Sequence, residues 1–242
     1  MGRWQGSCSD FRTENLVLGF LEHGKEDPKA ANEQMRIIIG VTGASGSIYG
    51  WRILEKLSRS PAVELHLILS RSGERTAHLE LGKSAADFRK LADFCYAPED
   101  IGCRLSSGSF PTSAMVIAPC SIHTMSSIAA GISSNLIVRA ADVTLKERRK
   151  LVLMVRESPF HLGHLRSMIA LAEMGAIVAP PVPGFYHRPQ TIEDLVDQSV
   201  DRVLDLLGLP EPDARRWDGP PRLGDRGRQR DPLNRDPEGA EQ

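Results

Sequence analysis

The chain contains 242 residues, 41% of them hydrophobic, which is enough for one substantial core and favours a single domain. Thirty Lys and Arg residues against 31 Asp and Glu residues leave a formal net charge of −1, which excludes a general attraction to nucleic acid or to an anionic membrane. The four cysteines form no CxxC pair and have no metal-ligand spacing, so we expect no metal site and a reducing, cytoplasmic location.

Three segments of different composition follow one another along the chain. Residues 1–34 are polar and mixed in charge, and their one apolar run lacks the features of a secretory signal, so we interpret them as an N-terminal extension. Residues 35–209 are predicted to form the folded domain, and no apolar run in the chain reaches the roughly 20 residues of a membrane helix. Residues 210–242 are rich in Pro, Arg, Asp and Gly and are expected to be a largely flexible tail.

Apolar runs of strand length alternate with segments of helical period in residues 35–209. Five nearly continuous apolar runs are predicted to be strands buried on both faces: 36–41, 63–70, 114–118, 151–155 and 176–179. Between them apolar residues recur at helical spacing, as in Ile48, Trp51 and Leu54, and the last such pattern covers 192–206. This alternation indicates an α/β fold with a parallel sheet flanked by helices.

Ligands of such a sheet bind outside the carboxyl ends of the strands. The loops that follow four predicted strands are therefore expected to converge on one site: 42–47, 70–74, 119–124 and 156–159. The first loop lies in Gly40-Val-Thr-Gly-Ala-Ser-Gly46, where glycines let backbone N–H groups approach a phosphate at the start of a helix. The alternative is a tight turn that binds no ligand.

The end of the second strand indicates which nucleotide the glycine loop binds. An NAD enzyme places an acidic residue there for the ribose, but this chain has Ser70-Arg71. Arg71 suits the 2′-phosphate of NADP, so a short-chain reductase is an alternative. The catalytic Tyr-x-x-x-Lys of that family is missing, because none of the three tyrosines is followed four residues later by lysine.

Two later loops contain further candidates. In 119–124, Ser121 and Thr124 stand at the start of a helix, a spacing that is typical of capping when taken alone. Cys120 is either a nucleophile or, more commonly beside a buried strand, a small hydrophobic residue. His123 in the same loop is equally ambiguous.

Charged and proline-rich segments complete the pattern. Arg156 and Glu157 follow a buried strand at its ligand-facing end, where charges are costly unless they bind something. The basic run 146–150, taken alone, is typical of a solvated helix face. Residues 180–189 are stiff because proline fixes φ, and they form either a plain connector or a support that holds Tyr186 against a ligand.

Seven ordered motifs between residues 35 and 217 resemble those of the flavin prenyltransferases, UbiX-like proteins formerly described as the small subunit of aromatic-acid decarboxylases. The motifs are Thr42-Gly-Ala-Ser-Gly46, Ser107-Gly-Ser109, Pro119-Cys-Ser121 with Thr124, Asn135-Leu-Ile with Arg139-Ala-Ala-Asp142, Leu145-Lys-Glu-Arg-Arg149, Arg156-Glu157 with Pro159, and Pro183-Gly-Phe-Tyr-His187 with Pro189. The resemblance implies a Rossmann-like, flavodoxin-type domain that binds FMN. It also implies metal-independent transfer of a dimethylallyl group from its phosphate ester to flavin atoms N5 and C6.

The resemblance implies a role for individual residues. Those that match FMN-binding positions are Gly43, Ala44, Ser45, Ser70, Ser121, Thr124 and Arg139. Those that match positions around the prenyl phosphate are Lys146, Arg156, Glu157, Tyr186, Arg202 and, in some family members, Trp217. The expected catalytic residues are Ser45, Glu80, Lys146 and Glu157. In this interpretation Lys and Arg stabilise the departing phosphate, and a positioned carboxylate handles protons.

The resemblance also implies partners. The prenylated FMN serves a UbiD-type decarboxylase, including the one of ubiquinone biosynthesis. The family's sites form where subunits meet, so we expect a homo-oligomer, a dodecamer, in which Glu80 reaches the flavin of a neighbour. Two other functions stay open: an NADP-binding regulator, and a flavin-dependent cysteine decarboxylase, although that activity expects an early histidine that does not follow the first loop.

Overall fold

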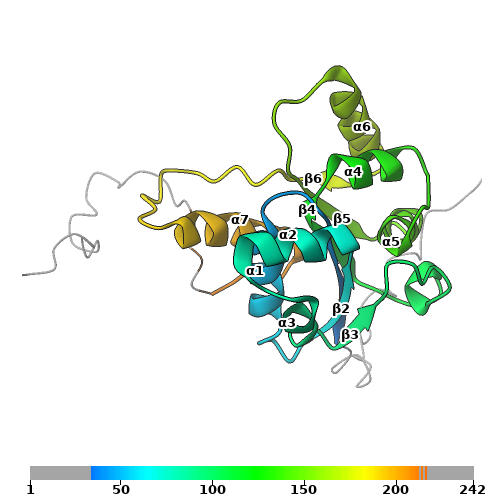
Figure 1. The fold of residues 1–242 in the computed structure, drawn as a ribbon, viewed down its shortest axis with the longest axis horizontal. Helices are drawn as coiled ribbons and strands as arrows, with labels where there is room; N and C mark the ends of the chain where they lie inside the picture. Colours follow the sequence, from blue (N-terminus) through cyan, green and yellow to red (C-terminus); the bar gives the residue numbers. More distant parts are fainter. Residues whose placement is uncertain (1–33, 213, 215, 217–242) are drawn as a thin grey trace, which may run out of the picture. The chain divides into compact units, whose positions relative to one another are not determined.

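Six parallel strands form the central sheet of the computed structural model, in the order β3-β2-β1-β4-β5-β6 (Figure 1). The structure describes residues 34–212, 214 and 216. The strands are β1 (Met35–Val41), β2 (Val63–Leu69), β3 (Phe94–Tyr96), β4 (Ala114–Cys120), β5 (Lys150–Val155) and β6 (Ile177–Val178). The helices are α1 (Ser47–Leu57), α2 (Arg71–Leu81), α3 (Ala85–Arg89), α4 (Ile122–Ala129), α5 (Leu136–Lys146), α6 (Leu162–Glu173) and α7 (Ile192–Leu207). The strand order reverses between β1 and β4, which makes their shared end the topological switch point.

The predicted α/β class is confirmed. All five predicted strands are present, and the helix predicted over 192–206 is α7. Strand β3, which has three residues and lies at the edge of the sheet, was not predicted. The extension and most of the tail lie outside the described residues, but Arg216 near the end of the described chain donates to Asp205 of α7 at 2.8 Å. Within the described residues, no helix is long and apolar enough to cross a membrane.

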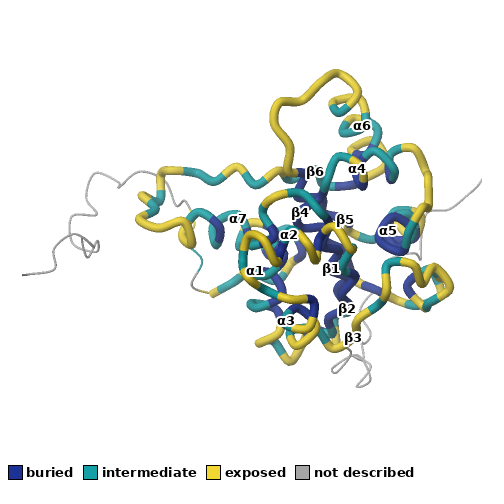
Figure 2. Tube along the Cα trace, in the orientation of Figure 1, coloured by how far each residue is buried: buried dark blue, intermediate teal, exposed yellow. Residues whose placement is uncertain are grey.

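Side chains of the central strands alternate between two hydrophobic layers, as the pleat of a strand requires. On β1, Ile37 and Ile39 belong to one layer and Ile38 to the other. Residues of α1 and α7 complete the first layer, and residues of α4, α5 and α6 complete the second. The strands β1, β2, β4 and β5 are accordingly buried between the helices (Figure 2), which explains why their sequences are nearly continuous apolar runs.

Three ion pairs join α1 to α7 at the surface of the first layer, one of them between Lys56 and Asp197 at 3.8 Å. The Arg52 guanidinium binds Asp197 with two parallel hydrogen bonds, from Nε to Oδ1 at 2.9 Å and from Nη2 to Oδ2 at 2.8 Å. One turn along, Lys56 pairs with Asp201. A bidentate guanidinium–carboxylate pair fixes orientation as well as distance, so α7 has a defined register against α1.

A buried histidine, His66 of β2, lies beside the edge strand β3. His66 is fully buried, with Nε2 2.8 Å from Glu64 Oε1 and Nδ1 3.0 Å from the Tyr96 hydroxyl. Its ring also stacks on Phe94, with ring centroids 5.1 Å apart. Burial lowers the pKa of His66, and the hydrogen bond that its ring donates to the Glu64 carboxylate only partly opposes this effect.

This histidine makes stability depend on pH. The unfolded chain takes up a proton at a pKa of about 6.5 and the folded chain only at lower pH, so the free energy of unfolding should decrease as pH falls below about 6.5. His66→Gln keeps polar atoms at this place but does not titrate. Urea unfolding at about pH 7.5 and about pH 5.5 should therefore show a smaller loss of stability for the variant. Equal losses in both proteins would contradict this assignment.

Candidate functional site

Four loops meet at the carboxyl edge of the sheet, as predicted. Ser45, Ser70, Ser121 and Arg156 lie just beyond the ends of β1, β2, β4 and β5. Backbone hydrogen bonds join neighbouring strand ends. The Ser70 N–H donates to the Val41 carbonyl of β1 at 3.0 Å, and the Arg156 N–H donates to the Cys120 carbonyl of β4 at 3.0 Å. Helices α1, α2 and α4 begin here, so their N-terminal N–H groups and positive dipole ends lie at the same edge. Such an edge favours an anionic ligand.

Thr42 ties the first loop to the loop after β4. Its side chain is buried, and its hydroxyl donates to the Pro119 carbonyl at 2.6 Å while it accepts the Ser121 N–H at 2.9 Å. The Thr42 N–H also donates to Pro119, at 3.3 Å. One side chain thus fixes the position of Ser121 relative to the glycine loop.

Glycines let the loops of this edge pack against one another. A Cβ on Gly43 would lie 2.5 Å from Cβ of Ser72, and one on Gly73 would lie 2.7 Å from the Val41 carbonyl oxygen. Gly46, at φ +101°, adopts the left-handed conformation that glycine prefers. The start of α1 therefore presents backbone N–H groups that can bind an anionic group.

Hydroxyl groups cap two of the helices that start at the site. Ser70 accepts the Gly73 N–H at 3.0 Å, and Ser121 accepts the Thr124 N–H at 3.3 Å while donating to the Thr124 hydroxyl at 3.1 Å. The capping interpretation is therefore confirmed. Capping is compatible with ligand binding. The first turn of a helix that begins at the carboxyl edge of the sheet directs its capping hydroxyl and its remaining N–H groups towards a ligand at that edge.

Glu80 reaches the glycine loop of its own chain. Its carboxylate accepts the N–H groups of Gly46 and Ser47, at 3.0 and 2.8 Å. Burial acts to raise the pKa of Glu80, but hydrogen bonds from the Ser45 hydroxyl and from the two N–H groups hold it below its ordinary value. Within the single chain, Glu80 is thus an ionised carboxylate at the start of α1 and does not need a neighbour to meet Ser45.

Arg156 and Glu157 are exposed at the same edge, after β5. The positive charge of Arg156 acts on Tyr49 of α1, where burial raises the pKa of the hydroxyl and the arginine opposes that shift. The Glu157 carboxylate accepts the N–H of Ser158 at 2.9 Å, which orients it along the loop. Both side chains remain accessible to a ligand placed outside the sheet.

The ambiguity of Cys120 is resolved by burial. Its side chain is fully buried in the second layer, and this burial raises the pKa of the thiol to about 12. About one thiol in ten thousand is then ionised at pH 8, which is too few for a nucleophile. Cys120 is a small core residue, whereas the neighbouring His123 is exposed on α4.

Two predicted residues lie on α5, Arg139 in its first turn and Lys146 at its end. Arg139 pairs with Asp142 at 2.7 Å and donates to the Ser106 carbonyl at 3.1 Å. Lys146 pairs with Glu147 beside Gly108. Lys146 ends α5 just before β5 begins, so it lies at the amino edge of the sheet, opposite Ser45. A single chain therefore does not bring Lys146 to the glycine loop.

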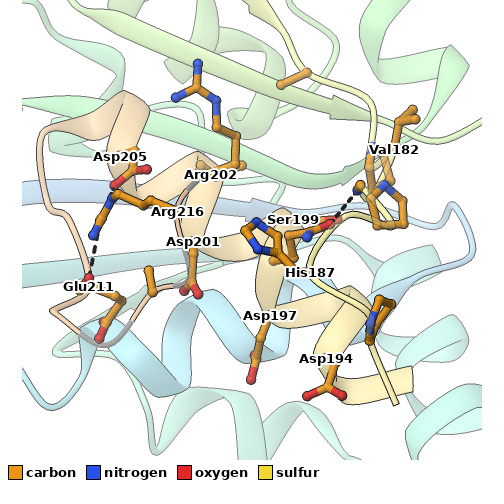
Figure 3. A pocket seen from close by; sticks show the side chains of 18 of the residues that line it. Val182, His187, Asp194, Asp197, Ser199, Asp201, Arg202, Asp205, Glu211 and Arg216 are labelled. Atoms are coloured by element: carbon orange, nitrogen blue, oxygen red, sulfur yellow. Dashed lines mark hydrogen bonds and ion pairs between the residues drawn. The ribbon is translucent and has the colours of Figure 1, made fainter. Parts of the chain in front are cut away.

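Tyr186 and Arg202 line a cavity of about 630 Å³ between α7 and residues 180–189, which Met154 of β5 and Ala179 after β6 also line (Figure 3). Arg202 points away from Asp197 and Asp201, which face α1. It takes no part in the ion pairs that these two residues form with Arg52 and Lys56. The predicted Trp217 lies outside the described residues. The structure thus groups the predicted residues into three places: the carboxyl edge, the α5 face and this cavity.

Two further residues support the site but were not among the predicted ones. Thr42 joins two loops, and Gln198 of α7 accepts the N–H of Gly184 in the proline-rich segment. Thr42 belongs to the Thr42-Gly-Ala-Ser-Gly46 motif, but nothing in the sequence indicates that its hydroxyl binds the carbonyl of Pro119. Gln198 is a polar residue on an amphipathic helix, where polarity ordinarily signals solvent exposure.

Comparisons with known proteins agree with this geometry. The Flavoprotein family matches residues 25–204. The flavin prenyltransferase UbiX of Thauera aromatica is 51% identical over 185 residues, which are 76% of this chain and 95% of that protein. The structure of AnUbiX (PadA1) in complex with FMN and dimethylallyl pyrophosphate matches with a TM-score of 0.76 and 43% identity, over 78% of this chain and 100% of that one.

A dodecameric FMN-dependent UbiX-like decarboxylase from Escherichia coli O157:H7 matches with a TM-score of 0.75 and 48% identity, over 76% of this chain and 100% of that one. Such identity over nearly the whole length of the relatives decides between the alternatives of the sequence analysis. The NADP-binding regulator, the reductase and the cysteine decarboxylase are not supported. The loops and helix N-termini at the carboxyl edge of the sheet agree with these relatives, and the chain belongs to the UbiX-like family of flavin prenyltransferases.

Proposed function

We propose that this chain transfers a dimethylallyl group from dimethylallyl phosphate to atoms N5 and C6 of FMN, and that the prenylated FMN serves a UbiD-type decarboxylase. The observation that most strongly supports the proposal is the edge where Ser45, Ser70 and Ser121 follow three parallel strands beside three helix N-termini. FMN, when bound there, supplies the ring that accepts the dimethylallyl group. The residues proposed to hold it are Gly43, Ala44, Ser45, Ser70, Ser121, Thr124 and Arg139.

The residues proposed for the donor act on its leaving group. The allylic C–O bond breaks and its electron pair leaves with the phosphate, so cations near that oxygen lower the barrier. Lys146, Arg156 and Arg202 supply positive charge, and the Tyr186 hydroxyl supplies a hydrogen bond. Trp217 is proposed to face the allyl group, since aromatic faces stabilise cations.

Carboxylates complete the proposed site. Glu157, exposed beside Arg156, is proposed to accept and return the protons that the flavin releases. Glu80 is proposed to keep the Ser45 hydroxyl oriented, which is supported by its hydrogen bond to that hydroxyl and its lowered pKa. An ionised Glu80 accepts hydrogen bonds and donates none, so its part is to hold the loop rather than to protonate the substrate.

The site is proposed to be completed by neighbouring subunits in a homo-dodecamer. Lys146 stands at the amino edge of its own sheet, so a second chain is needed to bring it to a glycine loop. Large apolar side chains exposed on α6, such as Leu162 at 60% and Ile169 at 58%, support burial against another copy. We also infer a cytoplasmic location, supported by the free thiols of Cys95, Cys103 and Cys120.

Mass spectrometry of the flavin tests the reaction directly. Purified protein is incubated with FMN, a reductant and dimethylallyl monophosphate, and in a parallel sample with the diphosphate. The flavin extracted from at least one sample should gain the mass of one five-carbon unit. Unmodified FMN in both samples would refute the proposed transfer, and a requirement for added UbiD-type protein would show that the chain is not sufficient for it.

A further inference from the structure

Residues 180–189 form a proline-rich arm that carries Tyr186 beside α7. Three of the five residues 180–184 are proline and have no N–H group, so the arm has few donors with which to bind the rest of the chain. The N–H of Val182 donates within the arm, to Pro180 at 2.8 Å. The N–H of Gly184 donates to the side-chain oxygen of Gln198, and this bond ties the arm to α7.

The largest apolar side chains of this arm are exposed in the single chain, whereas Pro181, Pro183 and Pro189 are half-buried. Val182 is 81% exposed, Phe185 is 72% exposed and Tyr186 is 57% exposed. A polar contact therefore has a large share in fixing its position, since exposed apolar side chains supply little hydrophobic stabilisation.

The position of Gly184 decides where the ring of Tyr186 lies. A Cβ on Gly184 would lie 2.5 Å from Cε1 of Tyr186, so the ring packs directly on the glycine backbone. The ring also contacts His187, with ring centroids 4.0 Å apart. A shift of Gly184 would therefore shift the Tyr186 hydroxyl with it.

Gln198 follows a residue of α7 that is bound to α1. Asp197, the preceding residue, binds Arg52 of α1 in the bidentate pair. Gln198 and Arg202 are four residues apart, hence on the same face of the helix, and both line the cavity (Figure 3). The contact to Gly184 thus links the arm that bears Tyr186 to the helix face that bears Arg202.

We propose that Gln198 is a positioning residue: its side-chain oxygen holds the Gly184 N–H and so places Tyr186 opposite Arg202 for binding of the donor phosphate. This inference rests on the proposed function, because it assigns Tyr186 and Arg202 to the phosphate. Gln198 itself touches neither FMN nor the reacting atoms in this proposal.

Three variants test the proposal. Gln198→Leu removes the acceptor at similar size, Gln198→Glu keeps an acceptor oxygen, and Glu193→Gln is a control at an exposed position of α7 outside the cavity. Gln198→Leu should raise KM for dimethylallyl monophosphate about tenfold with a smaller change in kcat and in FMN affinity, as expected for the loss of one hydrogen bond. Glu193→Gln should stay close to the unaltered protein, whereas Gln198→Glu places a carboxylate on the helix face of Arg202 and is therefore compared by hydrogen exchange alone.

Hydrogen exchange of the peptide that contains Gly184 supplies a measurement independent of catalysis. Exchange there should become several-fold faster in Gln198→Leu and remain slow in Gln198→Glu. Unchanged exchange in Gln198→Leu, or equal effects of Leu and Glu, would overturn the positioning role. Faster exchange with unchanged KM would overturn its link to the phosphate. If Gln198→Leu does not fold, Gln198→Met replaces it in both measurements. If the unaltered protein makes no prenylated flavin, the proposed function fails, while the exchange result still decides whether Gln198 holds the arm.

Discussion

Arg202→Ala should reduce the single-turnover rate of dimethylallyl transfer about a hundredfold while FMN affinity stays nearly unchanged. Removing one preorganised charge partner of a departing anion costs about 3 kcal/mol in the transition state. Arg202 lines the cavity together with Tyr186 and points away from the acidic residues that face α1. Tyr186→Phe, which removes the hydroxyl alone, should also slow transfer without weakening FMN binding.

The competing interpretation is that Arg202 is an exposed surface residue of α7 with no part in binding or catalysis. An exposed helix arginine contributes a few tenths of a kcal/mol at most, so its removal would leave catalysis unchanged. Arg59→Ala is the control for an exposed arginine outside the cavity, because Arg59, in the turn after α1, is 72% exposed and pairs with Glu55 at 3.8 Å. A rate of Arg202→Ala equal to that of Arg59→Ala, with saturating FMN, would remove Arg202 from the site.

The extent of the sheet was largely predictable because its strands are buried on both faces. A strand such as β4, buried at all seven positions, has to be a continuous apolar run. The short strand β3 was not predictable in this way. Phe94 and Cys95 are exposed, and pairing with β2 over three residues leaves no periodic pattern in the sequence.

The candidate site was predictable where strand direction decides the geometry. Residues that directly follow parallel strands lie at one edge, so Ser70, Ser121 and Arg156 had to come together. Lys146 precedes a strand, and the same rule places it at the opposite edge, although its motif groups it with the site residues. The contact between Gln198 and Gly184 depends on the path of a proline-rich segment, which no local pattern determines.

Thr42→Val is expected to weaken FMN binding about tenfold and to lower the free energy of unfolding by about 1 to 3 kcal/mol. Valine has nearly the same shape as threonine but no hydroxyl. The part-buried N–H of Ser121 would lose the acceptor that it has at 2.9 Å, and the Pro119 carbonyl would lose the donor at 2.6 Å and keep only the Thr42 N–H at 3.3 Å. An unsatisfied buried group costs more than an ordinary hydrogen bond is worth, so the loops should separate to admit water.

Thr42→Ser is the control that isolates the hydroxyl, because it removes only the methyl group. It should retain FMN binding within about threefold and most of the stability, since the loss of one buried methyl group costs about 1 kcal/mol. FMN affinity is measured by quenching of flavin fluorescence, and stability by urea unfolding without FMN, so the two effects are separated. If valine and serine weaken FMN binding equally, packing by the methyl group rather than the hydroxyl bridge holds the two loops together.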